Sequence, residues 1–195
     1  RILRQVASSL GAAHARGIIH RDLKPENIFL VRDPEVPGGI RAKILDFGIA
    51  KLTGDASAAK TNTQAVMGTP AYMSPEQCRG AGLVDARSDV YALGCMLFEC
   101  LTGEGPFRRP SEVATLFAHL EEDPPSASAR HSPLPAAIDP VFARALAKEP
   151  DERQSSCAEL VADASAALGL DAVRPRRLRL ATAAAVLVLA AAALA

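Results

Sequence analysis

The chain has 195 residues, of which 49% are hydrophobic and 23% charged, a composition that supports one domain of moderate size and excludes wholesale disorder. Its 22 basic and 22 acidic side chains cancel, but four arginines gather at residues 174–179, so the rest of the chain is mildly acidic. An acidic body in which aromatic residues make up only 4% argues against nucleic-acid binding.

The first predicted elements are a helix and a β-hairpin. Apolar residues recur at steps of three and four over residues 3–14, and Gly17 marks the end of this helix. Because the chain opens without a methionine and inside this helix, we expect further residues upstream. Two apolar runs of strand length, 28–31 and 40–45, flank a stretch with prolines and adjacent glycines at 33–39. This pattern predicts a hairpin with a long turn.

A long loop and several helices are predicted for the rest of the domain. Residues 46–76 show little periodicity and many small polar side chains, which favours a functional loop. A helix that is apolar nearly all round follows at 88–101 and is expected to be buried. Ser88 or Asp89 is expected near its N-cap, and Gly103 lies just past its end. Further helices are predicted at about 111–121, 139–148 and 155–168. The fold class is therefore α+β, mainly α-helical, with a small β-hairpin.

The strongest motif is His-Arg-Asp-Leu-Lys-Pro-Glu-Asn at residues 20–27. It resembles the catalytic loop of protein kinases. The resemblance implies that Asp22 accepts the proton of the attacking hydroxyl and that Lys24 supplies positive charge near the transferred phosphoryl group of ATP. It also implies that Asn27 binds one Mg²⁺. A lysine two residues after the aspartate resembles serine/threonine kinases rather than tyrosine kinases.

A second motif, Asp46-Phe47-Gly48, directly follows the second predicted strand. It is similar to the metal-binding segment of the same family, so Asp46 is expected to bind the Mg²⁺ that bridges the phosphates of ATP. By the same resemblance, Phe47 packs in the core and sets the active or inactive pose, and Gly48 permits the change between them. Phe29, on the first predicted strand, is assigned to the floor of the adenine site.

A third motif at residues 68–76 resembles the end of the kinase activation segment, with Ser74 in place of the family's alanine. The resemblance implies that Thr69 bridges the catalytic aspartate and lysine and favours serine and threonine substrates. It also implies that Glu76 pairs with the distant Arg153. Breaking a buried pair of this kind would leave an uncompensated charge.

Two further features concern the rigidity and switching of the site. Residues 85–94 resemble the start of the family's buried central helix, which implies that Asp89 accepts backbone N–H bonds from the catalytic loop. A simple N-cap is the alternative for this residue. In the family, an arginine placed like Arg21 helps to bind a phosphate on the activation loop, for which Thr61 and Thr63 are candidates. The alternative is that these threonines are ordinary polar linker residues.

His20 opens the first motif and is assigned a structural role in the same loop by the resemblance.

The end of the chain has the features of a membrane anchor. Residues 180–195 contain one polar side chain, Thr182, and follow the arginines directly. This order predicts the start of a single membrane-spanning helix with the domain on the cytoplasmic side. A buried C-terminal helix of the domain is the alternative. The chain accordingly divides into a kinase lobe at 1–168, a basic juxtamembrane linker at 169–179, and the anchor.

The chain is thus identified as a member of the bacterial, eukaryote-like serine/threonine protein kinases, with ATP and Mg²⁺ as cofactors. Its partners are expected to be protein substrates, a second copy for trans-autophosphorylation, and the membrane. The family's N-terminal lobe, with its glycine-rich loop and lysine, is absent from this chain, so the chain alone is expected to be inactive. A lobe-only pseudokinase that docks partners is the alternative. A small-molecule phosphotransferase is disfavoured by Arg21 and Glu76.

Overall fold

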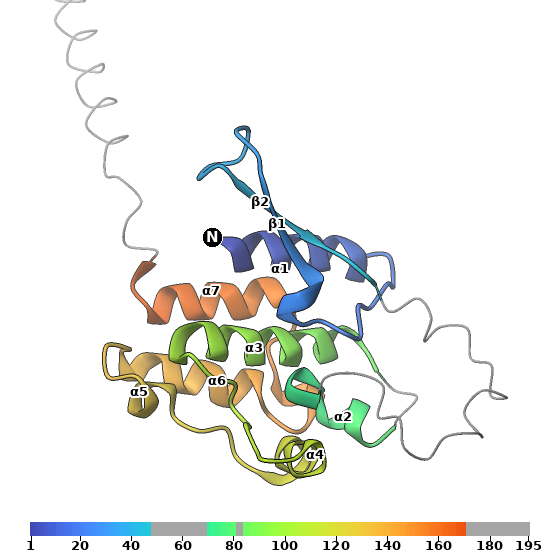
Figure 1. Cartoon of the computed structure of the whole chain (residues 1–195), viewed down its shortest axis with the longest axis vertical. Coiled ribbons are helices and arrows are strands. Elements are labelled where there is room, and N and C mark those ends of the chain that lie inside the picture. The colour runs from blue at the N-terminus through green and yellow to red at the C-terminus, as the bar shows by residue number, and fades with distance from the viewer. Residues whose placement is uncertain (48–69, 81–83, 171–195) are drawn as a thin grey trace, which may run out of the picture.

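In the computed structural model, residues 1–47, 70–80 and 84–170 are described, and they form a helical body with a two-stranded hairpin along one side (Figure 1). The helices are α1 (Ile2–His14), α2 (Pro75–Cys78), α3 (Ala86–Thr102), α4 (Glu112–Glu121), α5 (Ala127–Arg130), α6 (Asp139–Ala145) and α7 (Cys157–Ala167). The strands are β1 (Ile28–Arg32) and β2 (Ile40–Ile44). The expected α+β, mainly helical fold with a small hairpin is confirmed.

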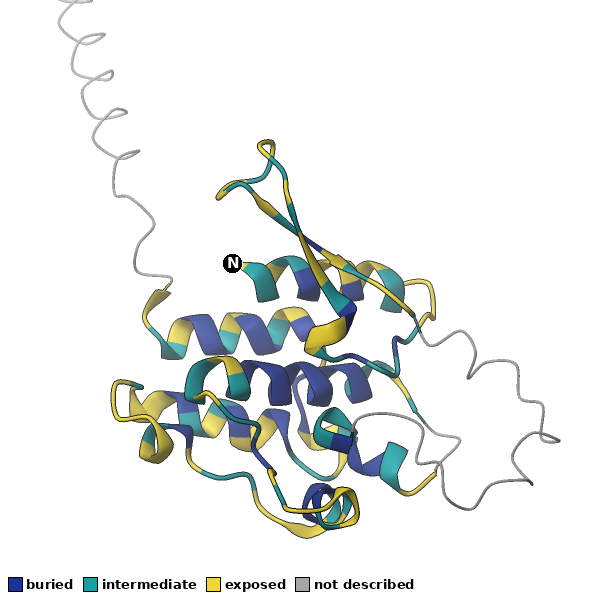
Figure 2. Ribbon diagram, in the orientation of Figure 1, coloured by how far each residue is buried: buried dark blue, intermediate teal, exposed yellow. Residues whose placement is uncertain are grey.

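Helix α3 lies at the centre of the body, between α7 and α6, and every residue in Ser88–Phe98 is buried (Figure 2). A helix that is apolar on all sides has no face to present to water, so this position agrees with its sequence. A β-carbon at Gly94 would lie 3.1 Å from Ala145 and 3.2 Å from Leu146. The glycine therefore lets α3 approach the end of α6 closely.

The N-cap of α3 differs from the one expected. Asp85 caps the helix by accepting a hydrogen bond from the Arg87 N–H at 2.7 Å. Ser88 and Asp89 lie in the first turn instead, and both are buried. Neither is the cap, because both side chains bind other segments: Ser88 donates to Glu76 at 2.5 Å, and Asp89 binds the loop that contains Asp22, as the resemblance implied.

Two one-turn helices, α2 and α5, are absent from the prediction, and α2 begins inside the stretch expected to be a loop. Four residues are too few to show an apolar period. Helix α2 depends on its cap, because Ser74 and Gln77 form a capping box and Pro75 occupies its first turn. Helix α6 ends at Ala145 rather than at residue 148.

The hairpin is antiparallel, with Ile28 at the start of β1 opposite Ile44 at the end of β2. Gln5 of α1 holds β2 in place: its Nε2 donates to the carbonyl of Ile40 at 3.0 Å, and its Oε1 accepts the N–H of Ala42 at 3.0 Å. Because the strands are antiparallel and Ile28 pairs with Ile44, the residues just before β1 and just after β2 are neighbours at the same end of the hairpin.

Several predictions concern residues that the structure does not describe. They are the span expected to begin at 180–195, together with Gly48, Thr61, Thr63 and Thr69. Within the described ranges, none of the helices combines the length and the hydropathy needed to cross a bilayer.

Candidate active site

The loop at residues 20–27 joins the end of α1 to β1 and brings three of the predicted site residues together. The Nζ of Lys24 lies 3.1 Å from Oδ2 of Asp22. The Nδ2 of the buried Asn27 donates to the main-chain carbonyl of Asp22 at 2.8 Å. Both Asp22 and Lys24 keep part of their side chains exposed. The carboxylate and the ammonium group therefore form a pair that a solvent-borne reactant can reach.

Asp89 of α3 binds the main chain of this loop. Its two carboxylate oxygens accept the N–H groups of His20 at 2.8 Å and Arg21 at 3.0 Å. His14, at the end of α1, places its Nε2 2.7 Å from the same carboxylate. The expectation that Asp89 binds the loop backbone agrees with this geometry. His14 is a residue that the sequence analysis did not assign, although a histidine on an otherwise apolar helix face is a signal for it.

His20 links the 20–27 loop to the segment after β2. Its side chain is fully buried, its Nδ1 accepts the N–H of Asp22 at 3.3 Å, and its Nε2 contacts the carbonyl of Leu45 at 3.0 Å. A neutral imidazole can do both only if Nε2 carries the proton. The ring also packs 4.9 Å from the ring of Phe47. The histidine therefore sets the position of the loop relative to Asp46.

Asp46 follows directly on this connection. The N–H of Leu45 donates to the carbonyl of Asn27 at 2.9 Å, which extends the hairpin pairing to the residue before Asp46. Asp46 is exposed and has a left-handed backbone, with φ of 53°. Because the side-chain nitrogen Nδ2 of Asn27 donates to Asp22, the side-chain oxygen Oδ1 is the atom of this amide that could bind a metal ion.

The chemistry of these two side chains fits Mg²⁺. The ion prefers oxygen ligands and is commonly held by one or two protein groups together with substrate phosphates. In the described part of the chain, no group of three or more His, Cys, Asp or Glu side chains could hold a metal by itself. Asn27 and Asp46 are two oxygen-bearing side chains, a set that suits an ion held jointly with the phosphates of a substrate.

Glu76 of α2 and Arg153 form a buried ion pair that joins segments 77 residues apart. The guanidinium binds both carboxylate oxygens, at 2.9 and 2.8 Å. It also donates to the carbonyls of Arg87, Ala147 and Lys148. Burial by itself raises the pKa of Glu76, but the bonds from Arg153 and Ser88 and the charge of Arg153 outweigh it, so that the pKa falls to about 2. The pair that the sequence led us to expect is present.

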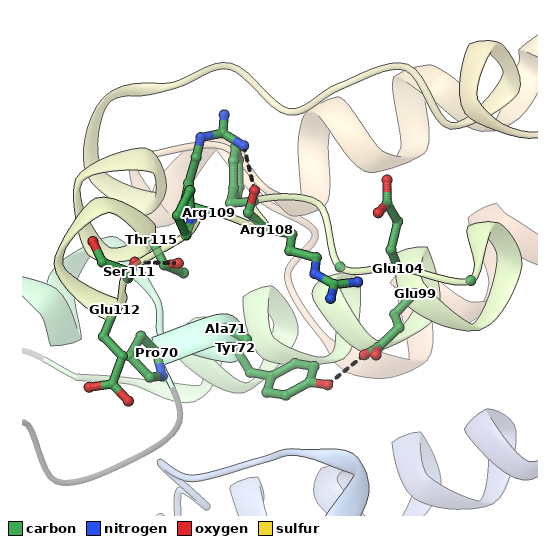
Figure 3. Close-up of a pocket in the computed structure, with 14 residues that line it drawn as sticks. Pro70, Ala71, Tyr72, Glu99, Glu104, Arg108, Arg109, Ser111, Glu112 and Thr115 are labelled. Atoms are coloured by element: carbon green, nitrogen blue, oxygen red, sulfur yellow. Dashed lines mark hydrogen bonds between the residues drawn. The ribbon is translucent and has the colours of Figure 1, made fainter.

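A cavity of about 400 Å³ lies beside the third motif, between Pro70–Tyr72, the end of α3 and the start of α4 (Figure 3). On one wall the hydroxyl of Tyr72 donates to Glu99 at 2.5 Å. Burial, followed by this bond, raises the pKa of Tyr72 well above its usual value, so the hydroxyl stays protonated. Arg108 and Glu112 also line the cavity. It is a depression with a mixed polar and apolar lining, large enough for side chains of a peptide.

Phe29 is a predicted site residue on the hairpin. It lies on β1 opposite Lys43, and 58% of it is exposed. Its assignment to the adenine site stays a prediction.

The fold and the arrangement around Asp22 together define the larger lobe of a protein kinase, and the chain belongs to this family. The family model described as "Protein kinase domain" matches residues 1–164. Similar curated proteins are the serine/threonine-protein kinase PknB of Mycolicibacterium smegmatis, 47% identical over 162 residues, and Pkn1 of Myxococcus xanthus, 49% identical over 158 residues. These alignments cover 83% and 80% of this chain but 25% and 22% of the relatives.

A solved structure gives the same result. The kinase domain of PknI from Mycobacterium tuberculosis matches with a TM-score of 0.62 and 32% sequence identity, covering 86% of this chain and 53% of that one. The chain therefore spans about half of a kinase domain.

Proposed function

We propose that this chain is the larger lobe of a serine/threonine protein kinase, which transfers the γ-phosphate of ATP to hydroxyl groups of proteins. The observation that supports this most directly is the pair of Asp22 and Lys24 at 3.1 Å, with Asn27 bonded to the main chain of Asp22. Phosphoryl transfer needs little covalent chemistry from the protein and depends on positioning and on charge. The site offers both.

The role of each side chain follows from its chemistry. Asp22 accepts the proton of the serine or threonine hydroxyl, and Lys24 stabilises negative charge that develops on the transferred group. Asn27 and Asp46 would hold Mg²⁺, which neutralises charge on the phosphates when ATP is bound. The cavity beside Pro70–Tyr72 lies next to the third motif, and we infer that it receives side chains of the acceptor segment.

The test is a transfer assay on the full-length protein with radiolabelled ATP, Mg²⁺ and a general protein substrate, followed by phosphoamino-acid analysis. We expect phosphoserine and phosphothreonine. We also expect that residues 1–195 alone transfer nothing, because they lack a glycine-rich loop and its lysine to hold ATP. Phosphotyrosine as the main product would contradict the proposal. Absence of transfer by a folded full-length protein would favour a docking module instead.

We propose that Thr61 and Thr63 are phosphorylated in trans by a second copy of the kinase and that the phosphate pairs with Arg21. A phosphate adds about −1.5 to −2 charge and can order a segment through an arginine. Replacing both threonines by alanine is expected to lower kcat by about tenfold, the value of one charge-assisted hydrogen bond. Thr53→Ala is the matched control in the same stretch. A fully active enzyme whose mass spectrum shows no phosphate at either threonine would remove this proposal.

We propose that residues 180–195 begin a membrane-spanning helix and that the lobe lies on the cytoplasmic side. Sixteen residues with one polar side chain, after four arginines, support this. We expect the full-length protein to stay with membranes in about 1 M salt, where surface charges are screened. Leu187→Arg with Leu189→Arg should move it to the soluble fraction, since each charge costs about 2.5 to 3.5 kcal/mol at the centre of a bilayer. Release of the unmodified protein by salt alone would contradict the anchor.

A further inference from the structure

Gln77 is a side chain that none of the recognised motifs includes, and it connects α2 to the loop that carries Asp22. Its Oε1 accepts hydrogen bonds from the N–H and the hydroxyl of Ser74, at 3.1 and 3.0 Å. Its Nε2 donates to the main-chain carbonyl of Arg21 at 2.6 Å, across 56 residues of sequence. Because Ser74 presents an N–H and Arg21 a carbonyl, only one orientation of the amide satisfies both.

The partner of Gln77 is the most constrained residue of the loop. Arg21 has a φ of 67°, in the left-handed region that a residue with a side chain adopts at a cost. Such a conformation persists only where the surroundings hold it. Asp89 holds the N–H of Arg21 at 3.0 Å, and Gln77 holds its carbonyl. Both sides of the strained residue are therefore bound by side chains from other elements.

The carbonyl of Arg21 belongs to the peptide group that leads into Asp22, so its direction sets where the Asp22 carboxylate points. We propose that Gln77 is a positioning residue for phosphoryl transfer: it fixes this peptide and thereby aims Asp22 at the acceptor hydroxyl. The proposal rests on the proposed kinase activity. It assigns to α2 a second task beside that of Glu76, which binds Arg153.

The space around the hydrogen bond between Gln77 and Arg21 leaves little room for a water molecule that could replace it. Arg21, Asp22, Gln77 and Asp89 line a cavity of only about 10 Å³, the lower limit for one water molecule. Truncation of Gln77 would enlarge the cavity and could admit a bridging water. Gln77→Glu keeps the shape and the acceptor for Ser74, but it places a carboxylate oxygen against the Arg21 carbonyl, so it is the sharper test.

The chain offers a matched control. Gln5 makes the same two kinds of bond between α1 and β2, donating to the carbonyl of Ile40 and accepting the N–H of Ala42, both at 3.0 Å. Gln5→Glu therefore makes the same chemical change away from the 20–27 loop. Gln77→Met, which neither donates nor repels, separates the loss of the bond from the repulsion.

The experiment measures kcat, both KM values, the unfolding midpoint, and hydrogen exchange of residues 20–24 in the full-length kinase. In Gln77→Glu we expect kcat to fall by about tenfold to a hundredfold, since a misplacement of about 1 Å can cost a hundredfold, with the KM for ATP within about twofold. The kcat of Gln77→Met should lie between the kcat of Gln77→Glu and that of the unmodified protein. Gln5→Glu should shift the unfolding midpoint by a similar amount and leave kcat unchanged. Exchange at residues 20–24 should accelerate only in the Gln77 variants.

An unchanged kcat in Gln77→Glu, or an equal loss in Gln5→Glu, would overturn the positioning role. If the unmodified protein transfers no phosphate, the proposed function fails. The hydrogen-exchange measurement still tests whether Gln77 holds the 20–27 loop. Protection of residues 20–24 that is the same in Gln77→Glu and the unmodified protein would overturn the claim that Gln77 holds the loop.

Discussion

Replacing Asp22 by asparagine in the full-length protein is expected to lower kcat for phosphoryl transfer by about 10² to 10⁴-fold, the usual contribution of a positioned acid or base. Asparagine has the same shape but cannot accept the proton of the acceptor hydroxyl. The fold of the loop should survive, because Asn27 binds the main-chain carbonyl of Asp22, at 2.8 Å, and not primarily its side chain. Affinity for Mg·ATP should therefore change little. Kinetics and nucleotide titration measure the two effects separately.

Two further variants show whether the loss of kcat is specific to Asp22. Asp46→Asn should weaken Mg·ATP binding as well as the rate, since Asp46 is the proposed metal ligand. Asp33→Asn removes the same charge from the turn of the hairpin, where Asp33 binds Arg41, and should leave kcat within about twofold. Near-normal turnover in Asp22→Asn would contradict its role as the base.

Arg153→Met is expected to destabilise the lobe by about 3 to 5 kcal/mol, the range for breaking one side of a buried ion pair. The Arg153 side chain is fully buried, and its removal would leave the carboxylate of Glu76 inside the protein without a cation. Replacing both partners, as Arg153→Met with Glu76→Leu, should recover much of the loss, because apolar groups of similar volume need no partner. Denaturant titration of the two single variants and the double variant gives the coupling.

An exposed pair provides the control. Arg144 lies 2.8 Å from Glu159 and 3.4 Å from Asp163, with all three side chains at least one-third exposed. Arg144→Met should therefore cost no more than about 1 kcal/mol. Equal losses in the free energy of unfolding for Arg144→Met and Arg153→Met would show that the buried Glu76–Arg153 pair contributes no more to stability than an exposed pair.

The pH dependence follows from the lowered pKa of Glu76, which is about 2 in the fold against 4.5 for a free side chain. Its contribution to stability is complete above about pH 4.5 and is lost as the pH falls towards 2. Without Arg153, burial dominates and raises the pKa of Glu76. Protonation of Glu76 at low pH therefore removes the buried charge and stabilises Arg153→Met. The stability difference between the unmodified protein and Arg153→Met should therefore narrow from pH 7 to pH 3. A stability difference that is the same at pH 7 and at pH 3 would mean that Glu76 is not charged in the folded unmodified protein at neutral pH.

The sequence by itself was sufficient for the parts of the site that are local. Asp22, Lys24 and Asn27 lie within six residues of one loop, so their spacing already placed them together. Helix α1, whose apolar residues recur at steps of three and four, was predicted for the same reason. The Glu76–Arg153 pair and the bonds of Asp89 came from the family resemblance, because no local pattern relates residues 77 or 69 positions apart.

The tertiary structure alone decided which polar residues serve the loop from a distance. His14 reaches Asp89 across 75 residues, and Gln77 reaches Arg21 across 56. In the sequence His14 is one polar side chain on an apolar helix face, and Gln77 lies in a helix of four residues. The N-cap of α3 was also decided by the tertiary structure, because Asp85 takes this position while Asp89 binds the loop. The partner of a hydrogen-bonding side chain depends on which elements pack beside it, and packing is set by the whole core and not by the neighbours along the chain.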